Sequence, residues 1–281
     1  MSNQEGTLYI VATPIGNLDD ISARAVVVLR SVDTIYAEDT RHSGRLLQHL
    51  GIKTPLKSLH EHNEEQRVPA VIAQLQAGQN LAVISDAGTP LISDPGFRLV
   101  SACHEQGVTV TPVPGASALI TALCAAGLPT DSFVYLGFPP GRSSARRQWL
   151  KQQSEESRTL VLYESRHRIV DTLTDLCEVF GEARVATVAR ELTKTYETIR
   201  RGSLGSLLHW IGNHAEQQKG EFVLVIAGAP VKTIEEPELR RVLGILLTEL
   251  SVKSSASMAA QLTGQPRKRA YDLALSMRNE N

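Results

Sequence analysis

The sequence has little of several features that would assign it quickly to a class of protein. Its 29 basic residues face 30 acidic ones, which leaves a formal net charge of −1. This balance excludes a strongly basic protein that holds nucleic acid by its overall field, so a polyanion would have to bind to local patches. No stretch approaches the roughly 20 apolar residues of a transmembrane helix, and the first residues do not resemble a signal peptide. We expect a cytoplasmic protein.

Cysteine is also scarce, because the chain has only Cys103, Cys124 and Cys177. The three lie far apart in apolar, helix-like stretches, which suits neither a disulfide framework nor a zinc site. This distribution favours buried thiols in a reducing compartment. His60 and His62 have the spacing of two ligands on a strand, but without an obvious third ligand we interpret them as part of a polar loop. No metal is expected.

The glycine-rich fingerprints of the common nucleotide-binding folds are absent as well. Neither GxGxxG nor GxxxxGK[ST] occurs in the sequence. The first half instead alternates short apolar runs with helix-spaced apolar residues. The expected strands are 8–12, 34–37, 81–85 and 109–113, and the expected helices are 22–30, 40–50, 66–77 and 97–106. This alternation predicts a mostly parallel sheet with helices on its faces.

The pattern restarts after the Gly127-Leu128-Pro129 break. The second half has expected strands at 133–136, 159–163, 185–189, 197–201 and 222–227. Two of these strands follow each other directly, which predicts a mixed sheet. A linker-like stretch then precedes three short helical patterns. We therefore expect an α/β protein with two α/β domains, 1–118 and 119–233, and a small helical domain, 234–281.

Loops rich in glycine and proline follow three strands of the first half, at 13–22, 85–96 and 112–118. Ligands of parallel sheets bind at the carboxyl ends of the strands, and small residues let a ligand approach the backbone closely. One such loop could be a turn that caps the following helix. Three of them predict a pocket.

The same loops carry a resemblance to a known family. TPIGNLDDIS, AEDTRHSGRLL, SDAGTPLISDPG and PVPGASALITALCAAGLPTD resemble the signature blocks of the tetrapyrrole-methylase-like methyltransferases. Within that superfamily they are similar to the family that methylates the ribose 2′-oxygen of a cytidine in the decoding region of small-subunit (16S) ribosomal RNA. LVLYESRHR and ARELTKTYETIRRGSL fit that family too. The resemblance covers essentially the whole chain, and it implies a homodimer that binds S-adenosyl-L-methionine in a cleft between two α/β domains.

The resemblance also implies the cofactor contacts, position by position. They are Ile15, Ala87, Gly88, Thr89, Ile92, Ser117, Ala118, Glu164 and Leu192. One position departs from the superfamily, which has Gly-Asp-Pro where this chain has Gly88-Thr89-Pro90. A carboxylate contact must therefore come from elsewhere or be absent, and Asp86 and Asp94 are the local candidates.

Methyl transfer to a ribose hydroxyl needs orientation, together with a base or a cation that stabilises the developing alkoxide. The candidates on loops that face the expected cleft are Lys194, Glu38, Asp39, Arg41 and Glu164. Lys194 is the preferred base or alkoxide stabiliser. Glu38 and Asp39 equally suit a helix N-terminus, where carboxylates are favourable, and Lys194 could simply pair with Glu191 at the surface.

Three basic segments are candidates for contact with RNA phosphates. Their residues are Arg142, Arg146, Arg147, Arg166, Arg168, Arg267, Lys268 and Arg269. The last three open the final helix of a helix-turn-helix-like pattern, where cations oppose the helix dipole and so indicate a partner. A solvated helix face for the first segment and a plain three-helix cap for the last remain alternatives.

The leading hypothesis is therefore an S-adenosyl-L-methionine-dependent ribose methyltransferase that acts on the small ribosomal subunit. One alternative is a methyltransferase of the same fold that acts on a tetrapyrrole or a protein side chain. The basic segments argue weakly against such substrates. The other alternative is a non-enzymatic RNA-binding or assembly protein with a vestigial pocket.

Overall fold

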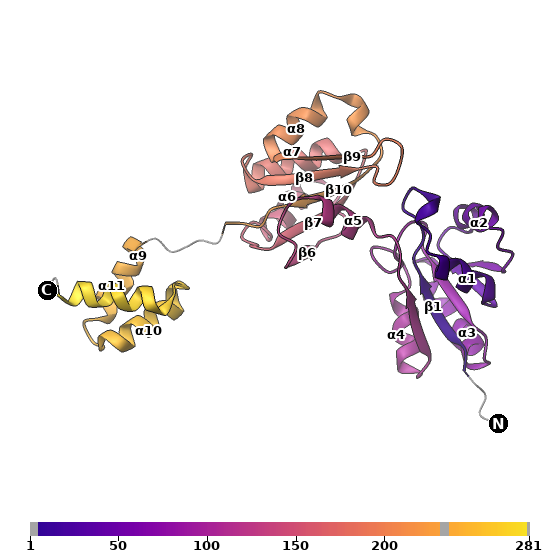
Figure 1. The fold of residues 1–281 in the computed structure, drawn as a ribbon, viewed down its shortest axis with the longest axis horizontal. Coiled ribbons are helices and arrows are strands. Elements are labelled where there is room, and N and C mark those ends of the chain that lie inside the picture. The colour runs from indigo at the N-terminus through magenta and orange to yellow at the C-terminus, as the bar shows by residue number, and fades with distance from the viewer. Residues whose placement is uncertain (1–4, 231–235, 280–281) are drawn as a thin grey trace. The chain divides into compact units, whose positions relative to one another are not determined.

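The structure, a computed structural model, describes residues 5–230 and 236–279. The chain divides into two compact units, Met1–Ala229 and Pro230–Asn281. Among the described residues, the first unit contains two five-stranded sheets with their helices, and the second contains three helices (Figure 1). The described part of the chain has no helix that is long and apolar enough to cross a membrane.

The first sheet is entirely parallel, with the strand order β3-β2-β4-β1-β5. Its strands are β1 (Thr7–Val11), β2 (Thr34–Ala37), β3 (Leu56–Ser58), β4 (Leu81–Ile84) and β5 (Thr109–Val113). Every residue of β2 and β4 is buried, as expected for parallel strands that helices cover on both faces. The helices α1 (Ala23–Ser31) and α2 (Thr40–His49) pack on one face, and α3 (Glu64–Gln76) and α4 (Phe97–Glu105) on the other.

The topology of this sheet creates a crevice between β1 and β4. From β1 the chain runs toward the β2 edge of the sheet, and from β4 it runs in the opposite direction, toward the β5 edge. In open α/β sheets, ligands bind at such a switch point, beyond the carboxyl ends of the strands. The loop after β1 and the loop after β4 are joined here by an isolated bridge between Thr13 and Gly88, whose backbone groups hydrogen-bond at 2.9 and 3.1 Å.

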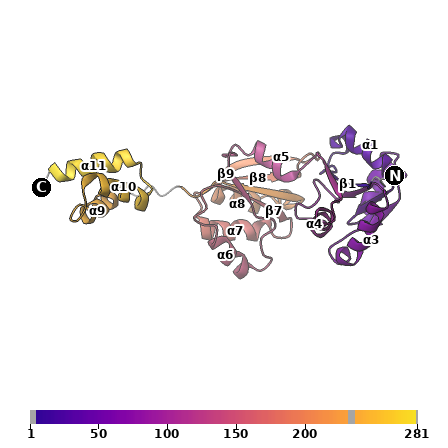
Figure 2. The same ribbon diagram turned by 90° about the horizontal axis from the view of Figure 1, so that it is seen from below.

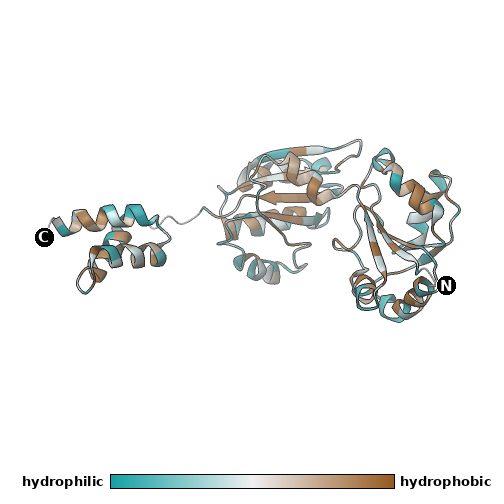
Figure 3. Cartoon of the chain, turned by 60° about the horizontal axis from the view of Figure 1, so that its bottom comes forward, coloured by the Kyte–Doolittle hydropathy of each residue, from teal (hydrophilic) through white to brown (hydrophobic). Residues whose placement is uncertain are grey.

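The second sheet is mixed, with the strand order β6-β7-β10-β8-β9. Its strands are β6 (Phe133–Tyr135), β7 (Thr159–Ser165), β8 (Val185–Arg190), β9 (Thr198–Ser203) and β10 (Glu221–Ile226), and only β6 and β7 pair in parallel. Helix α5 (Ala118–Ala125) covers one face, and α6 (Ser143–Lys151), α7 (Ile169–Phe180) and α8 (Leu204–Gly212) cover the other (Figure 2). The hydrophobic strands lie between these helices (Figure 3). The predicted pair of sheets, one parallel and one mixed, is thus confirmed.

The second unit is a bundle of α9 (Glu236–Leu246), α10 (Val252–Thr263) and α11 (Arg267–Asn279). Its small core contains alanines from α10 and α11, which let the two helices approach closely. Ser251 caps α10 by accepting a hydrogen bond from the Ser254 N–H, and Gly264 ends that helix at a φ of 65°. The predicted linker and the predicted boundary after residue 233 fall partly on 231–235, outside the described residues.

The expectation of three buried thiols is wrong for one of them. Cys103 is buried and Cys177 is partly buried, but Cys124 is exposed. Cys124 lies one helical turn from Ile120 on the side of α5 that faces away from the sheet, and Ile120 is 51% exposed. Because α5 is apolar on all sides, its sequence did not reveal which side is buried.

Candidate functional site

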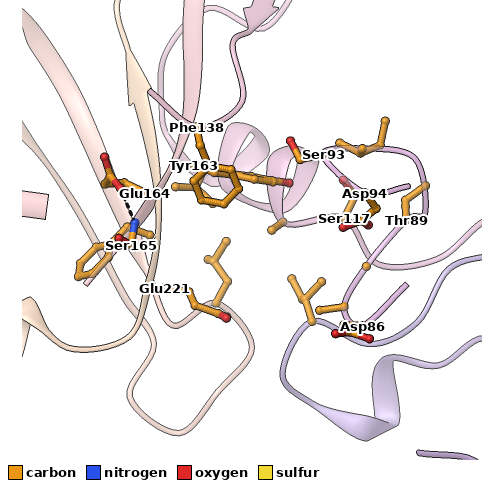
Figure 4. Close-up of a pocket in the computed structure, with 18 of the residues that line it drawn as sticks. Asp86, Thr89, Ser93, Asp94, Ser117, Phe138, Tyr163, Glu164, Ser165 and Glu221 are labelled. Atoms are coloured by element: carbon orange, nitrogen blue, oxygen red, sulfur yellow. Dashed lines mark hydrogen bonds between the residues drawn. The ribbon is translucent and has the colours of Figure 1, made fainter. Parts of the chain in front are cut away.

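A cavity of about 430 Å³ lies where the loops at the carboxyl ends of the first sheet meet the second sheet (Figure 4). This volume is typical of small-molecule sites. The loops after β1, β2, β4 and β5 form one wall, and residues of β7, β8 and β10 form the other. The lining residues are Ile15, Glu38, Asp86, Ala87, Gly88, Thr89, Ile92, Ser93, Asp94, Ser117, Ala118, Phe138, Tyr163, Glu164, Ser165, Ala189, Leu192, Glu221, Phe222 and Val223.

All nine residues that the resemblance implies as cofactor contacts line this one pocket. They are Ile15, Ala87, Gly88, Thr89, Ile92, Ser117, Ala118, Glu164 and Leu192. They come from five separate segments of the chain. The first sheet brings most of them together because parallel strands end at the same edge.

The loop after β4 is shaped by backbone conformations that few residues adopt. Gly88 has a φ of 85°, and a Cβ on it would lie 3.1 Å from Cγ2 of Ile15, so the loop approaches its neighbour closely. The Thr89 hydroxyl donates to the Ala116 carbonyl at 3.0 Å. Thr89, which stands where the superfamily has aspartate, therefore uses its hydroxyl to tie two pocket loops together.

A second tight junction joins the loop after β1 to the loop after β8. The Asn17 N–H donates to Oγ1 of Thr193 at 3.1 Å, and a Cβ on Gly16 would lie only 2.4 Å from Cγ of Lys194. Thr193 has a φ of 66° and Glu191 a φ of 50°, which non-glycine residues rarely adopt. Such strain persists where the surrounding structure enforces it, and it is common at functional sites.

Five carboxylates line the pocket, namely Glu38, Asp86, Asp94, Glu164 and Glu221. Glu164 pairs with Arg168 and Glu221 with Lys194, so the negative character comes mainly from the other three. Burial raises the pKa of Asp94 to about 6, and the nearby charges of Glu38 and Asp86 add to this, whereas a hydrogen bond from Ser85 opposes it. Burial also raises the pKa of Glu38, with the charge of Asp86 as the next cause. The pocket thus favours groups of positive charge and holds at least one carboxyl that titrates close to neutral pH.

Glu164 lines the pocket, but its carboxylate is fully engaged. Its side chain is buried, and it accepts hydrogen bonds from the Ser165 N–H at 2.6 Å and the Thr172 hydroxyl at 2.6 Å. The Arg168 guanidinium donates a third hydrogen bond at 3.0 Å. Glu164 therefore holds the end of β7 and Arg168 in place, and both of its oxygens already accept hydrogen bonds.

Lys194 does not line the pocket, and it is not suited to accept a proton. Its Nζ donates to Glu191 and Glu221, both at 2.8 Å. Burial alone would lower the pKa of Lys194, but the hydrogen bonds to the two carboxylates outweigh burial and raise it. The amine is therefore protonated at neutral pH, which does not suit a base, whereas the alternative role of Lys194, stabilising the developing alkoxide, stays a prediction.

Of the adjacent Glu38 and Asp39, only Glu38 lines the pocket. Asp39 is the N-cap of α2 and accepts hydrogen bonds from the N–H groups of Arg41 at 2.8 Å and His42 at 3.4 Å. These bonds, with the Arg41 side chain, hold the pKa of Asp39 below its ordinary value. The Arg41 side chain is 89% exposed and pairs with Asp39. Asp39 thus has the alternative role weighed for it, that of a helix cap.

The predicted RNA-contacting arginine Arg146 is the clearest correction. It is 1% exposed, and its Nε donates to Asp175 at 2.6 Å. Arg147 pairs with Glu178 at 2.6 Å, whereas Arg142, the residue that precedes α6 in the chain, is exposed. Arg146 belongs to the core between α6 and α7 and cannot contact RNA in this structure.

The remaining predicted basic residues lie at least partly in contact with solvent. Arg166 is exposed, and Arg168 is partly exposed beside Glu164. In the second unit Arg267 and Lys268 are exposed, whereas Arg269 contacts Glu236 at 3.9 Å and bonds to Gln265.

Sequence reasoning missed the aromatic residues of the pocket. Tyr163 lines the pocket near the end of β7, and its hydroxyl accepts a hydrogen bond from the Leu119 N–H at 3.0 Å. Tyr135 and Phe138 meet its ring edge-on, with centroids 5.1 and 5.6 Å away. Phe138 is 52% exposed and lies between Gly137, with a φ of 67°, and Pro139. An aromatic residue between glycine and proline just after a strand was the available signal.

The two sheets, their order and the pocket between them define a methylase of the tetrapyrrole methylase fold. Residues 7–208 match the family described as Tetrapyrrole (Corrin/Porphyrin) Methylases, and residues 233–278 match the RsmI C-terminal HTH domain. Among solved structures, the methyltransferase CobJ aligns with a TM-score of 0.59 at 18% identity, over 80% of this chain and 95% of that one. Uroporphyrin-III-C-methyltransferase from Thermus thermophilus aligns with a TM-score of 0.54 at 22% identity, over 79% and 94%.

More similar relatives cover nearly the whole chain. Ribosomal RNA small subunit methyltransferase I from Escherichia coli O157:H7 is 51% identical over 97% of this chain and 96% of its own length. The protein of the same name from Pseudomonas aeruginosa is 51% identical over 98% and 99%. The chain belongs to the tetrapyrrole methylase family and, within it, to the family of these two relatives.

Proposed function

We propose that the protein uses S-adenosyl-L-methionine to methylate the ribose 2′-oxygen of a cytidine in small-subunit (16S) ribosomal RNA. The observation that carries this proposal is the single pocket formed by all the signature loops of the family. The relatives named ribosomal RNA small subunit methyltransferase I support the substrate class. A ribosomal substrate in turn supports a cytoplasmic location.

The pocket fits S-adenosyl-L-methionine in size and charge. When bound, this cofactor supplies a methyl group on a sulfonium, and the molecule carries a net positive charge at neutral pH. Ile15 and Leu192 offer apolar surface on opposite walls, and Gly88 leaves its backbone accessible. Asp86 supplies a carboxylate for the cationic groups, which offsets the absence of an aspartate at position 89.

The acceptor side of the pocket fits a nucleotide taken out of a stack. Single-stranded RNA is commonly recognised by stacking of its bases on aromatic side chains and by arginine contacts to phosphates. Phe138 offers such a ring at the pocket, and Arg142 and Arg166 are exposed on the neighbouring loops. These residues orient the ribose, and orientation contributes much of the acceleration of a methyl transfer.

The test is transfer of labelled methyl from S-adenosyl-L-methionine to assembled small subunits, to naked 16S rRNA and to a tetrapyrrole. Label on RNA at one position, with the adjacent phosphodiester resistant to alkali, would support a 2′-O-methylated ribose. Alkali-labile label on RNA would indicate base methylation instead. Label on the tetrapyrrole alone, or on none of the three acceptors, would overturn the proposal.

We also propose that the protein is a homodimer and has domains at 1–118, 119–233 and 234–281. The two sheets with separate cores support the first boundary, and the separate helical unit supports a division near residue 230. The exposed Ile120 and Cys124 on one side of α5 support a protein partner there. Analytical ultracentrifugation of the full chain and of Ile120→Asp tests the dimer, which the variant should dissociate. A monomeric wild-type protein would contradict it.

A further inference from the structure

We propose that Asp94 is the catalytic base, which accepts the proton of the ribose 2′-hydroxyl during methyl transfer. This inference rests on the proposed function and names the group that activates its acceptor. It is carried by the position of Asp94 in the pocket and by the engagement of the other ionisable groups there.

Asp94 lies on the wall formed by the loop after β4, across the cavity from Tyr163 (Figure 4). Ser93, with a φ of 66°, and Pro95 flank it, so the backbone that carries the carboxylate is restrained on both sides. The Ser93 hydroxyl and the Tyr135 hydroxyl lie 2.6 Å apart, which ties this loop to β6. A base held on a fixed loop needs little reorganisation to reach its substrate.

The other pocket groups are less suited to take a proton. Glu164 has its oxygens occupied by three donors, and Glu221 is 78% exposed and pairs with Lys194. Asp86 accepts a hydrogen bond from the Asp39 N–H at 3.2 Å.

Asp94, like Asp86, has a single hydrogen-bonding neighbour, and it lies on the wall opposite Tyr163. Within residues 5–230 and 236–279 it forms no ion pair, and its polar neighbour is the Ser85 hydroxyl, which also donates to the Gly88 carbonyl at 3.0 Å. Glu38 is the remaining carboxylate, and its pKa is raised less strongly than that of Asp94.

The surroundings of Asp94 suit a base that works near neutral pH. Glu38 and Asp86 face it with like charge, and the phenols of Tyr135 and Tyr163 face it from the second sheet. With burial, the two carboxylates raise the pKa of Asp94 to about 6, so it is mostly ionised at neutral pH yet more basic than an ordinary aspartate. A base is most effective when its pKa lies near the working pH.

The step balances in atoms and charge. The 2′-oxygen forms a bond to the methyl carbon of the sulfonium donor, and the carbon–sulfur bond breaks with its electron pair left on sulfur. The hydroxyl proton passes to a carboxylate oxygen of Asp94, which becomes neutral. The sulfonium charge and the carboxylate charge disappear together, and the proton then leaves to water.

The experiment compares the full-length wild type with Asp94→Asn, Glu38→Gln and Asp94→Glu between pH 5 and 9, at saturating S-adenosyl-L-methionine. For the wild type, kcat should rise with pH because the base must be ionised, with a midpoint below the value of about 6 in the ligand-free protein, since the positive charge of the bound cofactor favours the carboxylate. Asp94→Asn should lower kcat by about 10²- to 10⁴-fold and remove this rise with pH, which is the acid limb of the pH profile. Glu38→Gln should keep the limb but move it to lower pH, because a neighbouring negative charge is gone. Asp94→Glu should keep the limb with a reduced kcat.

Two further readouts separate catalysis from binding and folding. Calorimetry should give Asp94→Asn an affinity for S-adenosyl-L-methionine within about three-fold of the wild type. Carbon-13 NMR of aspartate carboxyls in the ligand-free protein should show one resonance that titrates near pH 6 and is missing in Asp94→Asn. Asp131→Asn, at an exposed turn, is the matched control and should behave as wild type.

Several outcomes would overturn the assignment. They are an unchanged kcat in Asp94→Asn, a loss confined to cofactor affinity, and a limb that Glu38→Gln abolishes. If Asp94→Asn does not fold, Asp94→Glu decides, since a base role requires its kcat to retain the acid limb. A wild-type protein that methylates no RNA would overturn the proposed function instead. The carbon-13 NMR titration of Asp94 does not depend on RNA methylation, so the two failures can be told apart.

Discussion

At the scale of single residues, Asp94 illustrates how a pocket can oppose stability. Its pKa of about 6 lies above the ordinary value of 3.8, so the folded state binds its proton more tightly than the unfolded state does. By linkage, this contribution to stability is fully present below about pH 4 and is lost as the pH rises through 6. At neutral pH the buried charge therefore lowers the free energy of unfolding.

We expect Asp94→Asn to raise the free energy of unfolding at pH 7.5 by about 1 kcal/mol, a value that allows for partial screening by solvent. The gain should largely disappear at pH 4.5, where the wild-type carboxyl is mostly neutral. Urea unfolding at the two pH values measures the difference. A variant that is less stable than the wild type at pH 7.5 would contradict this account.

Arg146 and Asp175 form a buried ion pair whose role is structural. Removing one partner of such a pair leaves an uncompensated buried charge. Arg146→Ala should therefore lower the free energy of unfolding by about 3–5 kcal/mol. Arg142→Ala, at an exposed position four residues earlier, should change it by less than about 0.5 kcal/mol but weaken RNA binding. Urea unfolding with an RNA-binding assay on both variants checks this contrast, and equal stability losses would refute it.

At the scale of elements, the junction between the loops at 13–17 and 191–194 holds the two halves of the pocket together. A Cβ at Gly16 would lie 2.4 Å from Cγ of Lys194 and 3.0 Å from the Leu192 carbonyl oxygen. The lysine side chain can move, but the carbonyl belongs to a strained backbone and moves less readily. A substitution here should therefore separate the loops.

Gly16→Ala should weaken the binding of S-adenosyl-L-methionine by about ten-fold, which corresponds to about 1.4 kcal/mol. Gly212→Ala is the matched control, because a Cβ there meets nothing within 4 Å. Calorimetry on the two variants and the wild type gives the comparison. Wild-type affinity in Gly16→Ala would show that the junction does not shape the pocket.

The loop after β6 presents Phe138 as a rigid aromatic surface, and its removal should affect RNA rather than cofactor. Loss of one base-stacking contact costs about 1–3 kcal/mol. Phe138→Ala should thus raise KM for RNA by about 10- to 100-fold, with Phe138→Trp close to wild type. Steady-state kinetics with varied RNA, beside calorimetry of the cofactor, tests this. An unchanged KM for RNA would exclude stacking.

At the scale of the whole molecule, the chain has two kinds of surface suited to RNA: the basic residues around the pocket and the exposed Arg267 and Lys268 at the start of α11. With a net charge of −1 there is no global attraction, so each local contact should be visible in the salt dependence. Replacing Arg267 and Lys268 by alanine should flatten the slope of log K against log salt by up to about 2. Lys53→Ala with Lys57→Ala removes the same charge from exposed positions elsewhere and should leave the slope unchanged. Filter binding between 50 and 300 mM salt decides, and equal slopes for both double variants would contradict a role for α11.

The sequence by itself determined the architecture and the location of the pocket. Alternating strands and helices are local patterns, and the parallel strands of the first half must place their glycine-rich loops at one edge. Seven of the nine cofactor positions that the resemblance implies lie on these loops, and the second sheet adds Glu164 and Leu192 to the same cavity. Tertiary structure alone decided which charged side chains face it. Arg146 pairs with a residue 29 positions away, and Lys194 with one 27 positions away. Neighbours such as Glu38 and Asp39 differ because one faces the cavity and the other caps a helix. The composition of a loop predicts that it turns, but the direction of each side chain depends on contacts that only the assembled sheets create.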